Sequence, residues 1–560
     1  MSTSGGITGS HLMARALKLE GVTNIFTIAG DHTLPVMDVM SDMDFRFIDT
    51  RHEQAASFMA DAWGRITGGL GVVMTTTPGM ANAIPGMANA LHSESPMLSL
   101  SGSAELSELG MGANQEIDQV ALAGAVTKGS WLIHDARRIP EMVAKAVRTA
   151  YAERRGPVHL TLPLDVQEQK VSEDEVTFYP GVQSQTSRTQ RADKEQVAEA
   201  VRLLNGARKP FIIAAASAGY SADGSALQRL IETTRAPLMT ADQARGLVSD
   251  DHPYCFGFFD TALNWAAKAI GEADVVILLG KKLDNSIRYG SIFGPGAKVI
   301  QVDPSPTEVG RNRPVDVGMV GDISAIVDQM AAEAAKLQWK ELPWLEQLRA
   351  RREAQAEWYE SQAVAETPMH ATFVHKTLSR FLKPDDILVW DGGDFGHFGR
   401  ALHSARHPLR WFYFSQFGTL GNGLPTALAA KVAHPNSRVV LMTGDGGFGF
   451  TAMEYDTAVR HNLNIVGILG NDATWGIDYH IQMGLYGRPT VTNLLHTRYD
   501  KVVEGLGGHG EHVQEHQDLA PALERAFASS KPSLVNVEIQ NAISPRAQAS
   551  IDRWLERRAG

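Results

Sequence analysis

The sequence predicts an α/β protein with three domains, each built on a mainly parallel sheet. Short apolar runs alternate with amphipathic helical stretches along most of the chain. Several of these runs end in glycine, aspartate or asparagine, which suits loops at the carboxyl ends of strands. Strands that alternate with helices form parallel sheets covered on both faces. The length of 560 residues agrees with about three to four domains.

The first domain is predicted within residues 1–170. A helix over residues 7–20 precedes a strand over 22–28, and this strand ends close to Asp31 and His32. The alternation of helix and strand then continues to the end of the domain. The further strands are expected at residues 46–49, 71–75, 97–101 and 158–163, and the further helices at 54–67 and from 77 onward.

Two more domains and a tail complete the predicted organisation. The polar stretch 166–194 is interpreted as a linker that leads to a central domain over residues 190–336. The charged stretch 336–367 is interpreted as a helical connector to the third domain, residues 366–545, and residues 546–560 form the tail. The strands of the central domain are expected at residues 210–214, 274–279 and 298–302.

Composition excludes several classes of protein. The chain is 44% hydrophobic and 21% charged, as in soluble globular proteins. Its formal net charge of −11 comes without a basic block, so nucleic acid is not an expected partner. The single cysteine, Cys255, excludes an intrachain disulfide and favours a reducing compartment. The N-terminal stretch lacks the pattern of a signal peptide, and no apolar run is long enough to cross a membrane. A cytoplasmic protein without a membrane partner is therefore expected.

The most informative stretch lies in the third domain. An apolar strand over residues 437–442 runs into a predicted glycine turn over 444–447, and a helix over 451–462 and a strand over 464–469 follow. This is a βαβ unit, whose strands lie parallel with their carboxyl ends at one edge of the sheet. Two acidic residues, Asp445 and Asp472, come directly after the two strands. Carboxylates beside a helix N-terminus suit a divalent cation that holds a diphosphate.

A dinucleotide fingerprint is the competing interpretation of this turn. Gly444, Gly446 and Gly449 have its spacing after a strand. The carboxylate of Asp445, however, would repel a pyrophosphate unless a cation lay between them. No acid follows at the spacing that ribose recognition requires.

These residues resemble the motif of thiamin diphosphate-dependent enzymes. In that family a Gly-Asp-Gly turn is followed, 27 residues after its aspartate, by the second asparagine of a pair, and the two side chains and a nearby backbone carbonyl bind magnesium. The resemblance carries these roles to Asp445, Asp472 and Thr474. This sequence departs from the pattern at Asp472, where the family usually has asparagine, although a carboxylate oxygen also suits a hard cation.

Two stretches of the first domain match the same family. The segment over residues 48–65 resembles the one around the family's cofactor-activating glutamate, which implies that Glu53 shares a proton with the aminopyrimidine ring. A glutamate at a helix start more often only complements the helix dipole. Pro78 and Asn82 match a Pro-Gly-x-x-Asn motif that lines the pyrimidine pocket with this glutamate.

Two stretches of the third domain match it as well. Residues 415–425 resemble a glycine-rich segment in which a bulky side chain wedges between the two cofactor rings, and Leu420 fits that wedge. The carbonyl of Gly418 fits the contact to the aminopyrimidine. The remaining residues that the resemblance assigns to the cofactor are Gly393, Asp394 and Phe395 on the diphosphate side, together with Gly444, Gly446, Gly447, Trp475 and Gly476.

Substrate-side residues are expected in the first domain. Asn114 and Gln115, before Glu116, resemble a stretch that acetolactate synthases and 2-hydroxyacyl-CoA lyases place beside the substrate. His32 matches a histidine of benzaldehyde lyase, although a structural role for it is as plausible. A second histidine of that enzyme is replaced here by Phe414. Arg400 and the tail resemble 2-hydroxyacyl-CoA lyases and oxalyl-CoA decarboxylases.

The resemblance covers nearly the whole chain and implies an architecture and a reaction. The three domains would be pyrimidine-binding, central Rossmann-like and diphosphate-binding, with active sites at the interface of a homodimer or homotetramer. The favoured reaction is a magnesium-dependent carbon–carbon lyase, reversible as a carboligase, that acts on an acyloin or 2-hydroxyacyl-CoA through a C2 carbanion and an enamine. The alternatives are an acetolactate synthase-like enzyme and a 2-oxo acid or oxalyl-CoA decarboxylase.

Whether the central domain binds a second nucleotide is left open by the sequence. Relatives bind FAD or ADP there through an arginine after one strand and an acid after the next, where this chain has Lys281, Lys282 and Asp303. Lysine lacks the bidentate fork of arginine, and Asp303 could cap a turn, so a redox role is not expected. Two rivals from other classes are a regulatory binding protein without turnover and a nucleotide-linked oxidoreductase.

Overall fold

The computed structural model describes residues 6–179, 181, 190–220, 224–413 and 416–559. Its residues form two compact units. Unit 1 comprises Met1–Ser187, Phe414–Pro435 and Met453–Leu463, and unit 2 comprises the rest of the chain. The chain therefore passes between the units five times. No helix in the part of the chain that the structure describes has the length and apolar character needed to cross a membrane.

Unit 1 is built on a six-stranded parallel sheet with the strand order β3-β2-β4-β5-β7-β6. Its strands are β2 (Asn24–Thr27), β3 (Arg46–Asp49), β4 (Gly71–Thr75), β5 (Met97–Ser103), β6 (Ser130–Leu132) and β7 (Pro157–Pro163), and β1 (Ile7–Thr8) pairs antiparallel with β8 (Lys170–Val171). Its helices are α1 (Gly9–Leu19), η1 (Asp31–Thr33), α2 (Leu34–Ser41), α3 (Glu53–Thr67), α4 (Thr77–Ser93), α5 (Gln119–Gly124), η2 (Ala136–Arg138), α6 (Ile139–Tyr151), α7 (Leu164–Glu168), η3 (Glu173–Glu175), α15 (Gly423–Ala433) and α17 (Glu454–Arg460).

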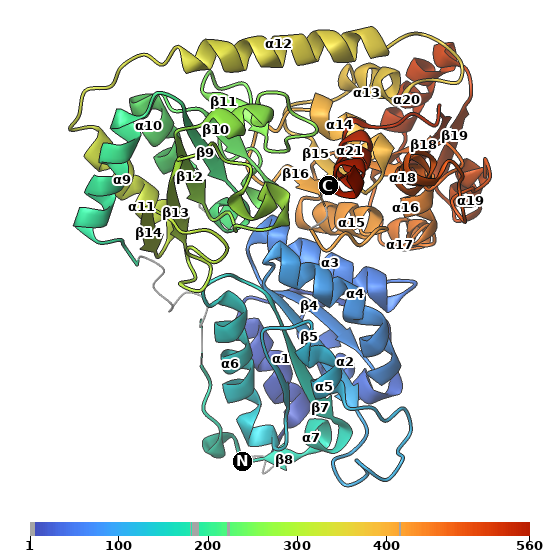
Figure 1. The fold of residues 1–560 in the computed structure, drawn as a ribbon. Coiled ribbons are helices and arrows are strands. Elements are labelled where there is room, and N and C mark those ends of the chain that lie inside the picture. The colour runs from blue at the N-terminus through green and yellow to red at the C-terminus, as the bar shows by residue number, and fades with distance from the viewer. Residues whose placement is uncertain (1–5, 180, 182–189, 221–223, 414–415, 560) are drawn as a thin grey trace. The chain divides into compact units, whose positions relative to one another are not determined.

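Helices cover this sheet because their apolar faces need burial. One core joins the strands to α1, α2 and α6 through side chains such as Leu12, Val36 and Val143. Helices α3 and α4 pack against each other, and α15 packs on α3 (Figure 1). At this last contact Nη2 of Arg65, buried and paired with Asp61, lies within hydrogen-bond distance of Oγ1 of Thr426.

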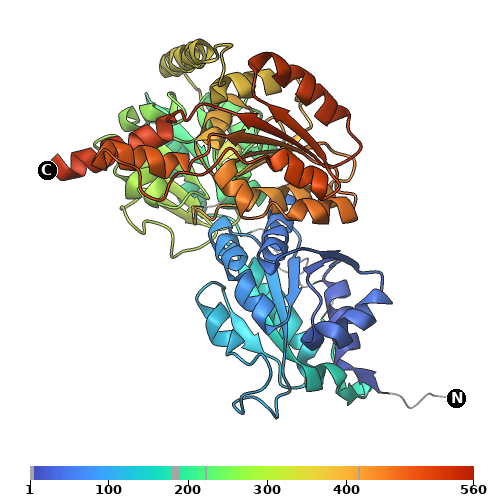
Figure 2. The same cartoon turned by 90° about the vertical axis from the view of Figure 1, so that its right-hand side faces the viewer.

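Unit 2 contains two more six-stranded parallel sheets. The central sheet has the order β11-β10-β9-β12-β13-β14, and the third sheet has the order β16-β15-β17-β18-β20-β19. Figures 1 and 2 show the strands of unit 2 from two directions. The central elements are α9 (Lys194–Gly206), β9 (Pro210–Ala214), η4 (Ala216–Tyr220), α10 (Ser225–Thr234), β10 (Leu238–Thr240), η5 (Asp242–Ala244), β11 (Cys255–Phe258), η6 (Ala267–Glu272), β12 (Val275–Leu279), η7 (Asn285–Gly290), β13 (Lys298–Asp303), β14 (Val317–Val320), α11 (Ile323–Ala334) and the long α12 (Trp344–Gln362).

The third sheet carries the stretch that the sequence singles out. Its elements are α13 (Ala371–Ser379), β15 (Ile387–Trp390), α14 (Asp394–Leu402), β16 (Trp411–Tyr413), β17 (Val439–Gly444), α16 (Asp445–Gly449), β18 (Val466–Asn471), α18 (Gly476–Tyr486), α19 (Tyr499–Gly505), β19 (His509–Val513), η8 (His516–Asp518), α20 (Leu519–Ala528), β20 (Ser533–Glu538) and α21 (Pro545–Ala559). Its core joins strand residues such as Met442 and Ile468 to Leu378 and Leu523 of the covering helices.

The predicted fold class is confirmed, because all strand pairs within the three large sheets are parallel. The predicted glycine turn over residues 444–447 is wrong. Residues from Asp445 to Gly449 form the helix α16, since β17 feeds directly into a helix and Asp445 supplies a negative charge at its N-terminus. The predicted linker over 166–194 is also wrong in part, because it contains β8 and η3. The predicted domain boundaries stay predictions.

Candidate functional site

Three neighbouring strands of the third sheet end together. Trp390 of β15 lies beside Met442 of β17, and Gly444 of β17 lies beside Gly470 of β18. The segments after these strands therefore meet at the carboxyl edge of the sheet, which is where α/β proteins bind their ligands. The segments are residues 391–394, 445–447 and 472–476.

Asp445 is a buried acid at this edge. Its side chain is almost fully covered, and its Oδ2 has no hydrogen-bond partner among the described residues. Burial, reinforced by the negative charge of Asp472, raises the pKa of Asp445 from 3.8 to about 8. A carboxyl group in this state needs a cation or a proton.

Asp472 faces a second carboxylate. Its Oδ1 accepts hydrogen bonds from the backbone N–H of Thr474 over 3.1 Å and from the hydroxyl of Thr474 over 3.0 Å. Burial raises the pKa of Asp472 to about 6, and the negative charge of Asp394 adds to this. A Cβ at Gly476 would lie 3.0 Å from Oδ2 of Asp394 and 3.3 Å from Oδ2 of Asp472. The two carboxylates therefore lie on either side of a small space that a side chain at position 476 would fill.

Asp394 is the first residue of α14, in the segment of Gly393, Asp394 and Phe395 that was expected on the diphosphate side. Its Oδ1 accepts a hydrogen bond from the backbone N–H of Ser544 over 3.3 Å, and its Oδ2 is buried without a partner in the described parts of the chain. Gly393 has a φ of 104°, which an L side chain would not tolerate. The ring of Phe395 packs against Gly470 and occupies the space that a side chain at that position would need.

The three aspartates fit a cation that is shared with a phosphate. Within the described ranges, none of Asp394, Asp445 and Asp472 forms an ion pair with lysine or arginine. The described residues also contain no group of three or more histidine, cysteine or acidic side chains arranged to hold a metal alone. Magnesium is commonly held by one or two carboxylates together with phosphate oxygens, and this arrangement suits that mode.

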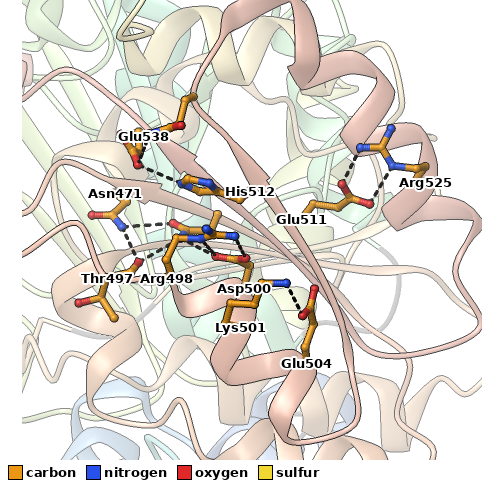
Figure 3. A network of polar contacts seen from close by, with 12 residues as sticks. Asn471, Thr497, Arg498, Asp500, Lys501, Glu504, Glu511, His512, Arg525 and Glu538 are labelled. Atoms are coloured by element: carbon orange, nitrogen blue, oxygen red, sulfur yellow. Dashed lines mark hydrogen bonds and ion pairs between the residues drawn. The ribbon is translucent and has the colours of Figure 1, made fainter.

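The position of Asn471, directly before Asp472, is fixed by a buried polar network (Figure 3). Nδ2 of Asn471 donates to the carbonyl of Thr497 over 3.1 Å and lies 3.2 Å from Oδ1 of Asn536. Nδ2 of Asn536 donates in turn to the same carbonyl over 3.1 Å and to Oδ1 of Asp500 over 3.3 Å. These hydrogen bonds fix the carboxyl end of β18 and so the position of the residue that follows it.

The small residues around Asp445 allow close packing. A Cβ at Gly446 would lie 2.7 Å from the indole of Trp475, and one at Gly447 would lie 3.2 Å from Cγ of Asp391. Gly444 is the N-cap of α16 and has no such close neighbour. Sequence reasoning missed Asp391, although an acid directly after an apolar strand is the signal that marked Asp445 and Asp472.

Glu53 and Asn82 come together in unit 1, as predicted. Glu53 is the first residue of α3 and is half-buried, and its Oε2 accepts a hydrogen bond from Nδ2 of Asn82 over 3.0 Å. Pro78 stands in the first turn of α4. A Cβ at Gly79 would lie 2.8 Å from Oε1 of Glu53, so α4 begins directly against this carboxyl group.

His32 is buried in η1, which follows β2 at the carboxyl edge of the sheet of unit 1. Its Nδ1 has no hydrogen-bond partner among the residues that the structure describes. Its backbone carbonyl accepts a hydrogen bond from Nε2 of Gln167 over 2.7 Å, and a Cβ at Gly102 would overlap this carbonyl. The backbone of His32 is thus fixed while one ring nitrogen stays unsatisfied.

The loop that contains Asn114 and Gln115 exposes both side chains, and Gln115 has a φ of 57°. The carboxylate of Glu116 accepts hydrogen bonds from the backbone N–H groups of Gly110, Ala113 (2.9 Å) and Gly112 (3.0 Å), and these bonds lower its pKa. Glu116 therefore shapes this loop, while Asn114 and Gln115 point away from the protein core.

The segment with Gly418 and Leu420 also belongs to unit 1. Gly418 has a φ of 78°, so the chain turns there in a conformation that favours glycine, and Leu420 is half-buried. The wedge position of Leu420 stays a prediction. Phe414, expected on the substrate side, lies outside the described residues.

The expected nucleotide contacts of the central domain are engaged in other bonds. Nζ of the buried Lys281 pairs with Oδ2 of Asp284 over 2.6 Å. Oδ1 of Asp303 accepts a hydrogen bond from the backbone N–H of Ser305 over 2.9 Å. Binding of ADP or FAD there stays a prediction.

Comparison with known proteins assigns the chain to a family. Residues 7–122 match the thiamine pyrophosphate enzyme N-terminal TPP binding domain, residues 197–330 match the central domain, and residues 391–537 match the C-terminal TPP binding domain. A probable acetolactate synthase of Mycobacterium bovis is 35% identical over 531 residues, 94% of this chain and 95% of that protein. A 2-hydroxyacyl-CoA lyase of Arabidopsis thaliana is 30% identical over 566 residues, 96% of each chain. The chain therefore belongs to the thiamine pyrophosphate-dependent enzymes, within the group of acetolactate synthases and 2-hydroxyacyl-CoA lyases.

Proposed function

We propose that this protein is a thiamin diphosphate- and magnesium-dependent carbon–carbon lyase, reversible as a carboligase. It cleaves a 2-hydroxy carbonyl substrate, for which a 2-hydroxyacyl-CoA is favoured over an uncharged acyloin. The observation that carries this choice is a basic cleft of unit 2 that begins at Ser544, whose backbone N–H donates to Asp394.

The carboxylates of Asp445 and Asp472 and the backbone carbonyl of Thr474 would hold the magnesium ion. The small residues Gly444, Gly446 and Gly447 and the turn of Gly393 and Asp394 would leave room for the diphosphate. Trp475, Gly476 and Phe395 would pack around it. When bound, thiamin diphosphate supplies a carbon nucleophile and an electron sink for breaking a carbon–carbon bond.

Glu53 would hold a proton at the cofactor's aminopyrimidine ring. The amide of Asn82 orients the glutamate, and the start of α4 shields it on one side. Pro78, Gly418 and Leu420 would position the rings. His32 would present its unsatisfied Nδ1 to the substrate, and Asn114 and Gln115 would contact the substrate from their exposed loop.

The basic cleft consists of two adjoining cavities of about 690 Å³ and 350 Å³. Four arginines, Arg288, Arg546, Arg553 and Arg557, line it. Arg546 pairs with Asp260 over 2.6 Å, whereas the other three form no ion pair within the described ranges. Burial lowers the pKa of Arg553, and the positive charges of the other three arginines lower it further. Arginines without carboxylate partners suit the phosphates of a CoA thioester.

Acetolactate formation from 2-oxo acids is the second candidate, favoured by the identity with proteins named acetolactate synthase. Decarboxylation of oxalyl-CoA or another 2-oxo acid is a third. A substrate panel with thiamin diphosphate and magnesium separates them: acyloins, 2-hydroxyacyl-CoAs, oxalyl-CoA and pyruvate. Aldehyde release from a 2-hydroxyacyl-CoA supports the proposal, and turnover of pyruvate alone contradicts it.

We also propose a homodimer or homotetramer in the cytoplasm with each active site shared by two subunits. Mixing inactive Glu53→Gln and Asp445→Asn subunits tests the shared site. Random dimers would regain about a quarter of the wild-type activity if each site combined residues of two chains. No recovery, with subunit exchange verified by mass, would contradict it.

A further inference from the structure

A second cavity of unit 2 contains none of the residues assigned above to the cofactor or to the basic cleft. It measures about 540 Å³ and lies among β11 with the loops around it, the long helix α12 and helix α14. Its lining includes Phe256 and Phe258 on the apolar side and Arg352, Tyr359 and Arg400 on the polar side. This is the size range of a pocket for a small organic ligand.

Arg400 is buried in this lining, where the more distant negative charges of Asp260 and Asp242 act on it. Its side chain is about 3% exposed, yet it forms no hydrogen bond or ion pair with any described residue, and its Nε is fully enclosed. Its guanidinium lies 3.6 Å from the ring centroid of Tyr413 and 5.2 Å from that of Phe258. Burial lowers its pKa, as expected for a charge removed from water. Such a side chain destabilises the ligand-free fold unless an anion compensates it.

Tyr359 is the second unpartnered group. It is 2% exposed, lines the same cavity and makes no hydrogen bond within the part of the chain that the structure describes. A buried tyrosine hydroxyl normally finds a partner. Here the open space beside it is the cavity itself.

The nearby acids are already paired. Asp250 pairs with Arg245, Asp251 with Arg406 over 2.7 Å, and Asp260 with Arg546 over 2.6 Å. Among the lining cations this leaves Arg352 and Arg400 without a carboxylate partner in the described residues. Two positive charges and a hydroxyl donor match a dianion with several acceptor oxygens.

We infer that this cavity binds a phosphate group. Arginine and tyrosine donate to its oxygens, and the phenylalanines cover whatever carries it. The phosphate belongs either to a free phosphorylated ligand or to the acidic end of a CoA substrate, and in the second case the inference rests on the proposed function.

Isothermal titration of the enzyme saturated with thiamin diphosphate and magnesium tests the inference with two probes, orthophosphate and CoA. Saturation keeps both probes from the diphosphate site. Arg400→Met and Tyr359→Phe are each expected to weaken binding at least about tenfold, which corresponds to about 1.4 kcal/mol. Arg229→Met, which removes an exposed arginine paired with Asp328, should leave binding unchanged. Orthophosphate that binds without competition from CoA identifies a free ligand, and mutual competition that is lost in Arg400→Met but kept in Arg553→Met identifies the CoA substrate.

A second measurement separates this role from a structural one. Thermal unfolding of the ligand-free Arg400→Met variant should occur close to the wild-type temperature or above it, because a buried charge that no hydrogen bond or ion pair stabilises is removed. Unchanged affinity for both probes in both variants overturns the inference, and so does a large fall in Tm of ligand-free Arg400→Met. Absence of cleavage of any substrate, with phosphate binding intact, would overturn only the proposed function.

Discussion

Asn82 donates a hydrogen bond from its Nδ2 to Oε2 of Glu53 over 3.0 Å. This amide fixes the carboxyl group at the start of α3 and leaves its other oxygen beside the backbone of α4. Such an arrangement suits a residue that exchanges a proton at a defined atom.

Glu53→Gln is therefore expected to keep thiamin diphosphate bound but to lower kcat by at least about 100-fold. Glutamine keeps the shape of the side chain and removes the proton exchange. Cofactor binding is measured by titration, and activation by the exchange rate of the cofactor's C2 proton. Glu105→Gln, at an exposed acid of the same unit, is the matched control. Normal proton exchange in Glu53→Gln would refute the assigned role.

Asp445→Asn should stabilise the metal-free protein while it abolishes tight cofactor binding. The folded protein holds the Asp445 carboxyl at a pKa of about 8, against 3.8 as the ordinary value, so folding takes up a proton between these values. Stability therefore falls as pH rises through this window, at about 1.4 kcal/mol per pH unit from this group alone. Thermal unfolding from pH 5 to 8, about the range of maximal stability, should lose part of its pH slope in the variant. An unchanged slope would mean that ionisation of Asp445 does not lower the stability of the folded protein.

Asn536→Leu should disturb the candidate metal site indirectly, through Asn471. It removes the amide that contacts Asn471 and leaves buried polar groups unpaired, at a cost of about 1–3 kcal/mol. Displacement of Asn471 should also move Asp472 and weaken magnesium-dependent cofactor binding. Urea unfolding and cofactor titration measure the two effects. Glu511→Gln weakens the pair between Glu511 of β19 and the exposed Arg525 of α20 (Figure 3) and should cost at most about 1 kcal/mol. Equal changes in stability and in cofactor binding for both variants would contradict the proposed role of the Asn471 network.

Arg553→Met should discriminate between the candidate substrates. Loss of one arginine of the basic cleft is expected to raise KM for a 2-hydroxyacyl-CoA about tenfold, the value of one charge-assisted contact. The KM for an uncharged acyloin and kcat should stay close to wild type. Steady-state kinetics with both substrates measures the split. A parallel rise of both KM values would indicate a general disturbance of the fold.

The sequence was most informative where chemistry follows directly after a strand. Asp445 and Asp472 were marked by their position directly after apolar strands, whereas Glu53 and Asn82 were assigned through the family resemblance of their segments. The helix α16 was missed because its glycines have a low intrinsic helix propensity, which the packing of the βαβ unit overrides.

Other features depend on contacts between distant parts of the chain. The approach of Asp394 to Asp472, and the cavity that brings Tyr359 to Arg400, have no local signal in the sequence. Each is set by how helices from separate segments pack.

The five passages of the chain between its two units limit how this protein can be divided. Any single cut leaves at least one unit with parts on both fragments. A gene fragment that ends after the first domain would lack α15 and α17, and so would present the face of α3 with Arg65 and Asp61 to water. Such fragments should be recovered as insoluble material when they are produced alone. Co-expressed fragments should instead assemble, which makes the protein suited to split-reporter designs rather than to expression of isolated domains.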